Sequence, residues 1–307
     1  MGRFNCSFCR AVLELGITGA YDFLDGFCYL NGCDHIRRVY DNWVRIVKIP
    51  FHHFLPVPHV LTEDGFKFYM EEVERFKEHI EQHFGVKITD EKLRESINVY
   101  NESRELLEKL YNLRAKENPP INGAQSLSIV AAASAMPRED FNIMLASLLK
   151  ELENSGGIRD YDARLMIVGS ELDQPSLIEI IEDLGGLVVT DSLCFGTRQF
   201  KGLVSGEGDP LEAVAKRYYY HNPCPRMLRE YPKKLGFVRE LAEKARVDGV
   251  IFEKIAFCDP HGVDNVMISK ELEEENIPTL ILERDYLISD VGRFRTRVQA
   301  FLERIGG

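Results

Sequence analysis

The residues of this chain best suited to metal or redox chemistry are its seven cysteines. Cys33, Cys194 and Cys258 each follow a short run of apolar, β-branched or aromatic residues, which is the pattern of a buried strand. After Cys258 the chain continues with Asp259 and Pro260, which are typical of a turn. Because ligands bind at the carboxyl ends of the strands in open α/β sheets, these thiols can converge although they lie far apart in sequence. The pattern therefore predicts a site built from cysteines at strand ends.

The C-x-x-C pair Cys6 and Cys9 opens a predicted helix, where the helix dipole and the first backbone amides stabilise a thiolate. This placement suits a redox dithiol and a metal ligand equally. A thioredoxin-like site would have a strand before the pair, but only five residues precede it. A zinc site would need a second closely spaced pair, and the nearest cysteines, Cys28 and Cys33, fall on a predicted strand. Cys28 itself is expected to be a buried packing residue, because cysteine behaves as a small hydrophobe.

The composition favours a globular protein that binds neither nucleic acid nor a membrane. Of 307 residues, 38 are Lys or Arg and 49 are Asp or Glu, so the formal net charge of -11 gives no basic footprint for nucleic acid. No apolar run approaches the roughly 20 residues of a membrane helix, and the first residues have no signal-peptide core. We therefore expect a soluble, cytoplasmic protein, in which an odd number of cysteines does not form a disulfide framework.

Strand and helix patterns alternate in the second half of the chain. Strands are predicted at 164–170, 185–192, 248–252 and 277–283, and helices at 175–184, 211–219, 233–246, 269–275 and 292–304. This alternation predicts an α/β fold with a doubly wound parallel sheet, as in Rossmann-like and flavodoxin-like domains.

The first half of the chain is predicted to have a different organisation. A strand is expected at 43–49, followed by a crossover loop at Pro50, Pro56 and Pro58, and helices at 63–84, 90–115, 127–135 and 141–152. His79 and His83 share one helix face, but without the H-E-x-x-H pattern they are expected to be a solvated pair. The predicted domains are a partial N-terminal α/β domain with the first cysteines (1–60), a helical region (61–157) and a C-terminal α/β domain (158–307).

The common nucleotide and hydrolase motifs are not found in the sequence. The G-S-E segment at Gly169 lacks the third glycine of a dinucleotide fingerprint, and no G-x-x-x-x-G-K-[ST] loop occurs. Ser170 does not lie in a G-x-S-x-G elbow. Any ATP-dependent step is therefore expected to be carried out by another chain.

Several blocks together resemble the 2-hydroxyacyl-CoA dehydratase and benzoyl-CoA reductase family, most closely the B and C subunits of the reductase. The resemblance covers nearly the whole chain in order, and its specificity comes from the agreement of all the blocks. They are C-S-F-C-R at 6–10, Y-D-F-L-D-G at 21–26, G-C-D-H-I-R-R-V-Y-D-N-W at 32–43, G-S-E-L-D at 169–173, V-V-T-D-S-L-C-F-G-T-R at 188–198, R-Y-Y-Y at 217–220, F-C-D-P at 257–260 and R-T-R-V-Q-A-F-L-E at 295–303.

The resemblance implies an oxygen-sensitive subunit that holds a four-iron four-sulfur cluster through Cys6, Cys33 and Cys258, with one iron left open as a Lewis acid. It implies an acyl-CoA thioester substrate, a homologous second subunit and a separate ATP-hydrolysing activator that supplies electrons. A ketyl radical formed at the thioester would either expel a neighbouring hydroxyl or lead to reduction of an aromatic ring. The acyl group, the choice between these reactions and the catalytic acid-base residues stay open.

Three alternatives remain. Cys9, Cys194 and Cys224 would bring the ligands to six, the number needed for a double-cubane cluster in a small-molecule reductase. The chain would otherwise be an electron-relay subunit whose partner binds substrate, or a plain α/β protein whose cysteines only pack.

The charged residues beside the cysteine blocks have two possible roles. Arg37, Arg38 and Arg198 would either meet CoA phosphates or form ion pairs that stabilise the fold. The recurring aspartates Asp34, Asp191 and Asp259 are expected to cap turns after strands. Family members carry a substantial α/β segment before the first cluster cysteine, so this chain is expected to be a fragment, a product of a misassigned start or a reduced variant.

Overall fold

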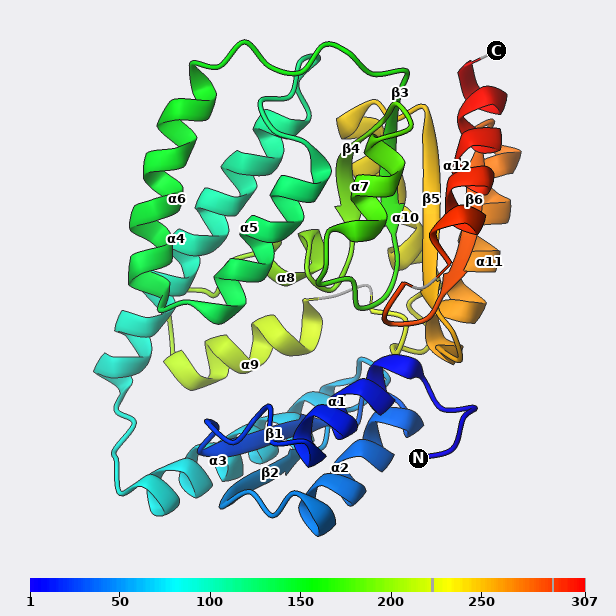
Figure 1. Cartoon of the computed structure of the whole chain (residues 1–307). Coiled ribbons are helices and arrows are strands. Elements are labelled where there is room, and N and C mark those ends of the chain that lie inside the picture. The colour runs from blue at the N-terminus through cyan, green and yellow to red at the C-terminus, as the bar shows by residue number, and fades with distance from the viewer. Residues whose placement is uncertain (222–223, 289, 307) are drawn as a thin grey trace. The chain divides into compact units, whose positions relative to one another are not determined.

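The computed structural model describes residues 1–221, 224–288 and 290–306, and the chain traced in Figure 1 is an α/β protein. The chain forms two compact units. Unit 1 contains Met1–Asn98 and Val204–Glu230, and unit 2 contains Val99–Leu203 and Tyr231–Gly307. This grouping does not test whether 1–60, 61–157 and 158–307 are separate domains, which stays a prediction. No described helix is both long and apolar enough to cross a bilayer.

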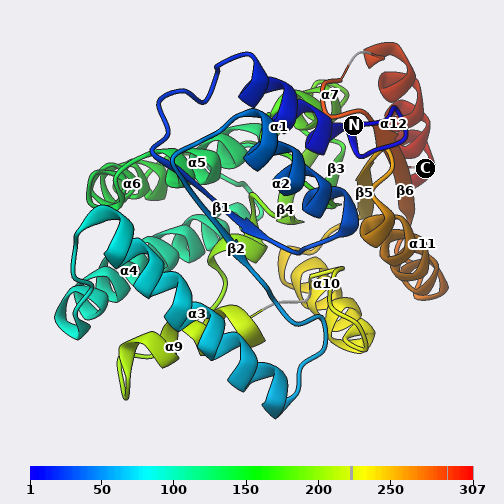
Figure 2. The same cartoon turned by 90° about the horizontal axis from the view of Figure 1, so that it is seen from below.

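Unit 1 is built on a small parallel sheet with helices packed around it. Strand β1 pairs with β2 in the register Gly26↔Phe51 to Leu30↔Leu55, and α2 connects them as the crossover helix of a βαβ unit. Figure 2 shows α3 and α9 side by side, and both belong to this unit. The elements of unit 1 are α1 (Ser7–Ile17), β1 (Gly26–Leu30), α2 (Asp34–Ile46), β2 (Phe51–Leu55), α3 (Glu63–Phe84) and α9 (Pro210–Tyr220).

The strand predicted at 43–49 is wrong, because residues 43–46 form the end of α2 and the strand is β2, between Pro50 and Pro56. The β-branched residues of this run suggested a strand, but the buried residues around it have the spacing of a helix. Val39 and Trp43, four residues apart, are both buried, and the Trp43 indole stacks on Phe27 of β1 with ring centroids 4.5 Å apart. Burial of this helix face therefore decides the local structure.

Helix α3 has the predicted bounds, but its histidines are not a solvated pair. His79 is half-buried, and its Nδ1 lies 3.0 Å from Nδ1 of His53 on β2. His83 is exposed, although its ring contacts Phe51. The start of α3 is hydrogen-bonded to α9, because the hydroxyl of Tyr219 accepts from the amide of Thr62 at 3.1 Å. The α3 face that touches β2 and α9 is thus the buried one.

Unit 2 contains a four-stranded parallel sheet in the order β4-β3-β5-β6. Strands β3, β4 and β5 are nearly continuously buried, whereas the edge strand β6 is buried at only half of its residues. One face packs on α7 and α12 through Leu165, Ile167 and Ile251, and the other packs on α10 and α11 through Met166 and Phe252. The predicted doubly wound sheet is confirmed. Its elements are β3 (Ala163–Val168), α7 (Ser176–Glu182), β4 (Gly186–Ser192), α10 (Tyr231–Ala245), β5 (Gly249–Ile255), α11 (Asp259–Glu274), β6 (Thr279–Arg284) and α12 (Val291–Gly306).

Further helices of unit 2 form a second hydrophobic cluster. Leu107, Leu110, Val130, Phe141 and Leu145 are its buried members from three different helices. The helices are α4 (Asp90–Arg114), which contributes residues to both units, α5 (Gly123–Ala135) and α6 (Arg138–Glu153), and the short α8 (Thr197–Phe200) follows β4.

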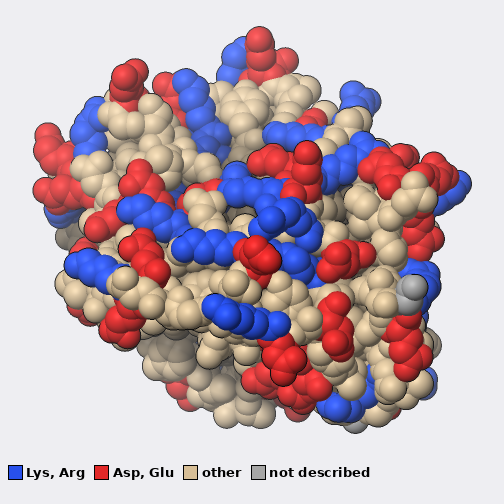
Figure 3. Space-filling model, turned by 90° about the horizontal axis from the view of Figure 1, so that it is seen from above, with Lys and Arg blue, Asp and Glu red and all other residues tan. Residues whose placement is uncertain are grey.

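Charge is mixed over the face of the molecule that Figure 3 shows. Asp and Glu side chains lie between the Lys and Arg side chains on this face. The formal net charge of -11 therefore does not reflect an acidic covering of that surface.

Candidate functional site

The three cysteines predicted to bind a cluster share one structural position. Cys6, Cys33 and Cys258 are the N-cap residues of α1, α2 and α11, and none of them makes a side-chain capping hydrogen bond. Each backbone carbonyl accepts the first bond of its helix, from Arg10, Arg37 and Gly262 at 3.1, 3.1 and 2.9 Å. Their thiols therefore lie at the positive ends of helix dipoles, where a thiolate is stabilised.

The thiol of Cys6 has a lowered pKa. A hydrogen bond from the side chain of Cys9 is the largest cause that lowers the pKa of Cys6 to about 6. The backbone amides of Cys9 and Phe8 lower this pKa further, while burial opposes them. The lowered pKa favours the thiolate, which is the form that binds metals.

His35 connects the beginnings of α1 and α2. Its Nδ1 accepts from the amide of Cys6 at 3.1 Å and lies 3.2 Å from Nδ2 of Asn5. Two donors at this atom mean that Nδ1 is the unprotonated ring nitrogen. Because His35 is in the first turn of α2, two residues after Cys33, it places Cys6 and Cys33 in one neighbourhood of unit 1.

Cys258 lies in unit 2, beyond the carboxyl end of β5. The strand ends at Ile255, and Phe257 then adopts a left-handed conformation with φ of 65°. The amide of Cys258 donates to the carbonyl of Ile255 at 2.9 Å, which closes the turn. A left-handed non-glycine residue costs roughly 1–2 kcal/mol. Such strain is typically retained at functional positions.

A polar network surrounds Cys194 at the ends of β3 and β4. Arg198 donates to the Cys194 sulfur at 3.2 Å and also to the carbonyl of Gly169. Burial raises the pKa of Glu171, while a hydrogen bond from Cys194 and the charge of Arg198 oppose this rise. Burial, and after it the charge of Arg198, hold the pKa of His261 well below its usual value. Sequence reasoning did not single out Glu171 or His261, and the only signal was their place in the G-S-E-L-D and F-C-D-P-H segments.

Three of the other predicted charged residues, Asp34, Arg38 and Asp191, have structural partners. Asp191 accepts from the amide of Thr197 at 2.8 Å, which is the expected turn cap, and forms a buried ion pair with Arg114 at 3.4 Å. Arg38 forms ion pairs with Asp34 and Asp41 at 3.5 and 2.8 Å. These contacts support fold-stabilising roles.

Sequence reasoning also missed a buried charge pair at the edge of the same sheet. Glu253 of β5 and Arg284 of β6 are 0% and 2% exposed, and Arg284 Nε donates to Glu253 Oε2 at 2.9 Å. Ser170 donates its hydroxyl to the same carboxylate at 3.0 Å, and a Cβ at Gly169 would overlap it. An isolated Glu within the apolar run V-I-F-E-K-I was the available signal.

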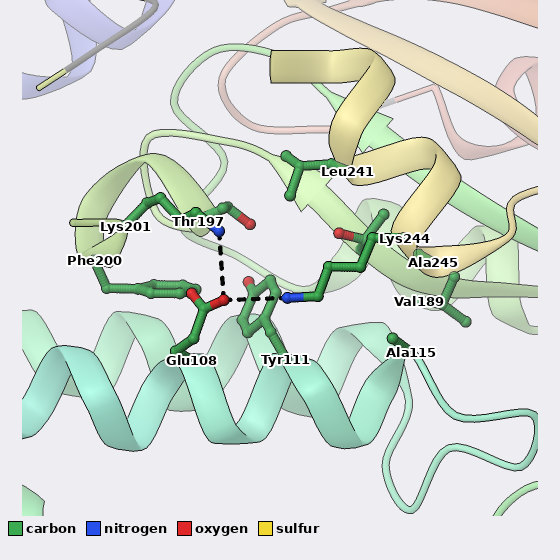
Figure 4. Close-up of a pocket in the computed structure, with 11 residues that line it drawn as sticks. Glu108, Tyr111, Ala115, Val189, Thr197, Phe200, Lys201, Leu241, Lys244 and Ala245 are labelled. Carbon is green, nitrogen blue, oxygen red and sulfur yellow. Dashed lines mark hydrogen bonds and ion pairs between the residues drawn. The ribbon is translucent and has the colours of Figure 1, made fainter. Parts of the chain in front are cut away.

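A cavity in unit 2 does not contain the predicted ligands. Figure 4 shows Glu108 bridging Lys201 and Lys244, at 3.4 and 3.2 Å, beside Tyr111 and Phe200. The cavity of about 20 Å³ holds roughly one water molecule, so it is too small for an acyl-CoA.

The predicted residues belong to two units of the structure. Cys6, Cys9 and Cys33 belong to unit 1, and Cys194 and Cys258 belong to unit 2. Cys28, expected to be buried, is exposed on β1, so the prediction of a packing role is wrong. Among the residues that the structure describes, no three His, Cys, Asp or Glu side chains gather as a metal-holding group, and no disulfide is present.

Comparison with known proteins gives one consistent result. A family model described as 2-hydroxyglutaryl-CoA dehydratase, D-component, matches residues 1–305. The benzoyl-CoA reductase of Thauera aromatica has a C subunit that is 30% identical over 281 residues, 90% of this chain and 72% of that protein. The (R)-phenyllactyl-CoA dehydratase beta subunit of Clostridium sporogenes is 26% identical, over 98% of this chain and 81% of that protein. The beta subunit of the lactoyl-CoA dehydratase of Anaerotignum propionicum is 28% identical, over 98% and 80%.

Proposed function

Because the chain belongs to the 2-hydroxyglutaryl-CoA dehydratase D-component family, we propose that it is an iron-sulfur subunit of an oxygen-sensitive enzyme acting on acyl-CoA thioesters. The reaction is either dehydration of a 2-hydroxyacyl-CoA or reduction of a benzoyl-CoA-type ring. Relatives that carry out both kinds of chemistry, by their names, are similar to this chain over most of its length.

The observation that supports this proposal is the shared N-cap position of Cys6, Cys33 and Cys258. Thiolates are the ligands that iron-sulfur clusters prefer, and helix N-termini offset the negative charge of such a group. The donor set therefore fits a four-iron four-sulfur cluster. When bound, the cluster would supply a low-potential electron and a Lewis-acidic iron.

The protein's own residues prepare these ligands. Cys9 donates a hydrogen bond to the Cys6 sulfur and keeps it ionised, and His35 accepts the Cys6 amide, which fixes the start of α1. The left-handed Phe257 directs the chain from β5 into the N-terminus of α11. Such supporting contacts orient ligands and tune the group that they hold.

The proposal includes partners and a compartment. A homologous second subunit is supported by the relatives, which are named as subunits. A separate ATP-hydrolysing activator would deliver the electron. The proposed location is the cytoplasm, where thiols stay reduced.

Iron and sulfide counts on anaerobically purified protein test the proposal. We expect about four irons per chain, and loss of the iron on replacing Cys6, Cys33 or Cys258 by Ser, because each removes one ligand. Cys28→Ser is the matched control, since Cys28 is exposed and its replacement should leave both the iron and the thermal midpoint unchanged.

Two results would contradict this assignment. About eight irons per chain would favour the double-cubane cluster with Cys9, Cys194 and Cys224 as added ligands. A Cys258→Ser variant that keeps its iron would remove that residue from the ligand set.

A further inference from the structure

A tyrosine hydroxyl in unit 1 is buried without a partner. Tyr29 of β1 is 7% exposed, and its hydroxyl oxygen is inaccessible and makes no hydrogen bond among the described residues. Buried hydroxyls are normally satisfied, because an unpaired one loses its bonds to water without replacement. An orphaned donor at this place therefore requires an explanation.

The ring of Tyr29 is held firmly by other aromatic rings. Its centroid lies 5.6 Å from that of Phe27, 5.5 Å from that of Tyr40 and 6.1 Å from that of Phe54. A side chain packed on three sides cannot easily turn its hydroxyl to another donor or acceptor. The orientation of the hydroxyl is thus set by packing.

The hydroxyl lies in the neighbourhood of the cysteines of unit 1. Burial is the largest cause that raises the pKa of Tyr29, and the charges of Cys9 and then Cys33 raise it further. Tyr29 is the next-to-last residue of β1, and Cys33, the N-cap residue of α2, follows the end of this strand after two residues. A buried hydroxyl without a partner at this place is available as a hydrogen-bond donor.

This inference rests on the proposed function, since it concerns the group held by Cys6 and Cys33. We propose that Tyr29 donates a hydrogen bond from its buried hydroxyl to a sulfur atom of the iron-sulfur cluster. Hydrogen bonds to cluster sulfurs are one of the factors that set reduction potentials. A donor stabilises the more negative, reduced form of the cluster, so the hydrogen bond from Tyr29 raises the reduction potential.

The test compares the wild-type chain with Tyr29→Phe, which keeps the ring and removes only the hydroxyl. In an anaerobic redox titration followed by electron paramagnetic resonance, the ratio of reduced to oxidised cluster at a fixed potential should fall about three- to tenfold. For one electron, a tenfold change corresponds to about 59 mV. The iron content should stay the same. In D₂O exchange experiments the wild type should show one exchangeable proton coupled to the cluster that the variant lacks.

Stability gives an independent measurement. In the cluster-free protein the hydroxyl has no partner, so Tyr29→Phe should leave the thermal midpoint unchanged or raise it. In the loaded protein the same substitution should lower the midpoint.

Tyr40→Phe is the matched control for the redox titration, because Tyr40 is the ring neighbour of Tyr29. This substitution should change neither the potential nor the exchangeable proton.

An unchanged potential in Tyr29→Phe would overturn the proposal. So would loss of iron from a folded Tyr29→Phe variant, because the hydroxyl would then be needed for assembly of the cluster and not for tuning it. A wild-type chain that contains no iron would overturn both this inference and the proposed function, whereas an iron-loaded wild type with an unaltered variant would overturn only the role of Tyr29.

Discussion

At the scale of single residues, the three N-cap cysteines differ from ordinary caps. Ser, Thr, Asp and Asn are preferred at this position because their oxygens accept hydrogen bonds from the first helical amides. Cys6, Cys33 and Cys258 make no such bond, so their helices lack this stabilisation, which is worth about 1 kcal/mol for each cap. Thr62 and Asp209, at the starts of α3 and α9, do make it. This lower helix stability is compatible with the ligand role that we propose for the three cysteines.

His261 leads to a prediction about pH. Its pKa is lowered in the folded protein by burial and by the charges of Arg198 and Lys234, although a hydrogen bond with Asn265 opposes them. A lowered folded pKa means that the unfolded chain binds the extra proton first, so stability is present above about pH 6.5 and is lost as the pH falls. The contribution to the slope is up to about 1.4 kcal/mol per pH unit.

Replacing His261 by Gln should remove this part of the pH dependence. Urea unfolding of the cluster-free protein between pH 7 and pH 5 measures the change, and the free energy of unfolding of the variant should fall less steeply than that of the wild type. The exposed His83→Gln serves as a control with the wild-type slope. Parallel curves for His261→Gln and the wild type would contradict the assignment.

The site was predictable from sequence only in part. The apolar runs before Cys33 and Cys258 correctly placed these residues near strand ends, because β1 and β5 are the strands that these runs form. The contributions of His35 and Tyr29 were not predictable. They depend on contacts between residues 29 apart in one case and on an unpaired hydroxyl in the other, and no local pattern encodes either.

At the scale of elements, the differences between expectation and structure arise from residues with two plausible local structures. Helix α11 begins at Asp259, whereas a helix was expected only from 269. Pro260 and Gly262 suggested a loop, but proline is well suited to the first turn of a helix, where its missing amide costs nothing. The earlier start gives Cys258 its N-cap position, so a boundary shift of ten residues changes the chemistry expected of that cysteine.

The ion pair between β5 and β6 permits an energetic prediction at this scale. Arg284→Met would leave the Glu253 carboxylate buried without its cation, and removing one partner of a buried pair costs about 3–5 kcal/mol. Chemical denaturation at neutral pH should show this loss. Arg293→Met, which breaks an exposed pair with Asp290, should change stability by at most about 1 kcal/mol. Equal losses of unfolding free energy in the two variants would contradict the prediction that the buried pair contributes more than the exposed one.

At the scale of the whole molecule, the family relationship predicts an assembly. Curated relatives are named as subunits, and this chain spans 72% to 81% of the three described above. We expect the isolated chain to bind iron but to show no turnover of CoA thioesters, because our proposal assigns part of the substrate site to a homologous partner. Co-expression with that partner, followed by gel filtration and an anaerobic assay with the activator, should yield an active complex. Full activity of a monodisperse monomer would refute this.

The discontinuity of unit 1 affects how the protein is made. Helix α9 lies after Val204, yet Tyr219 donates its hydroxyl to the carbonyl of Val60 at 3.0 Å, and its ring packs on Tyr69 of α3. During synthesis, the first 98 residues leave the ribosome before α9 does, so these contacts can form only after α9 has been made. At about 5–20 residues per second the delay is on the order of ten seconds, during which apolar side chains of α3 stay exposed to chaperones and proteases.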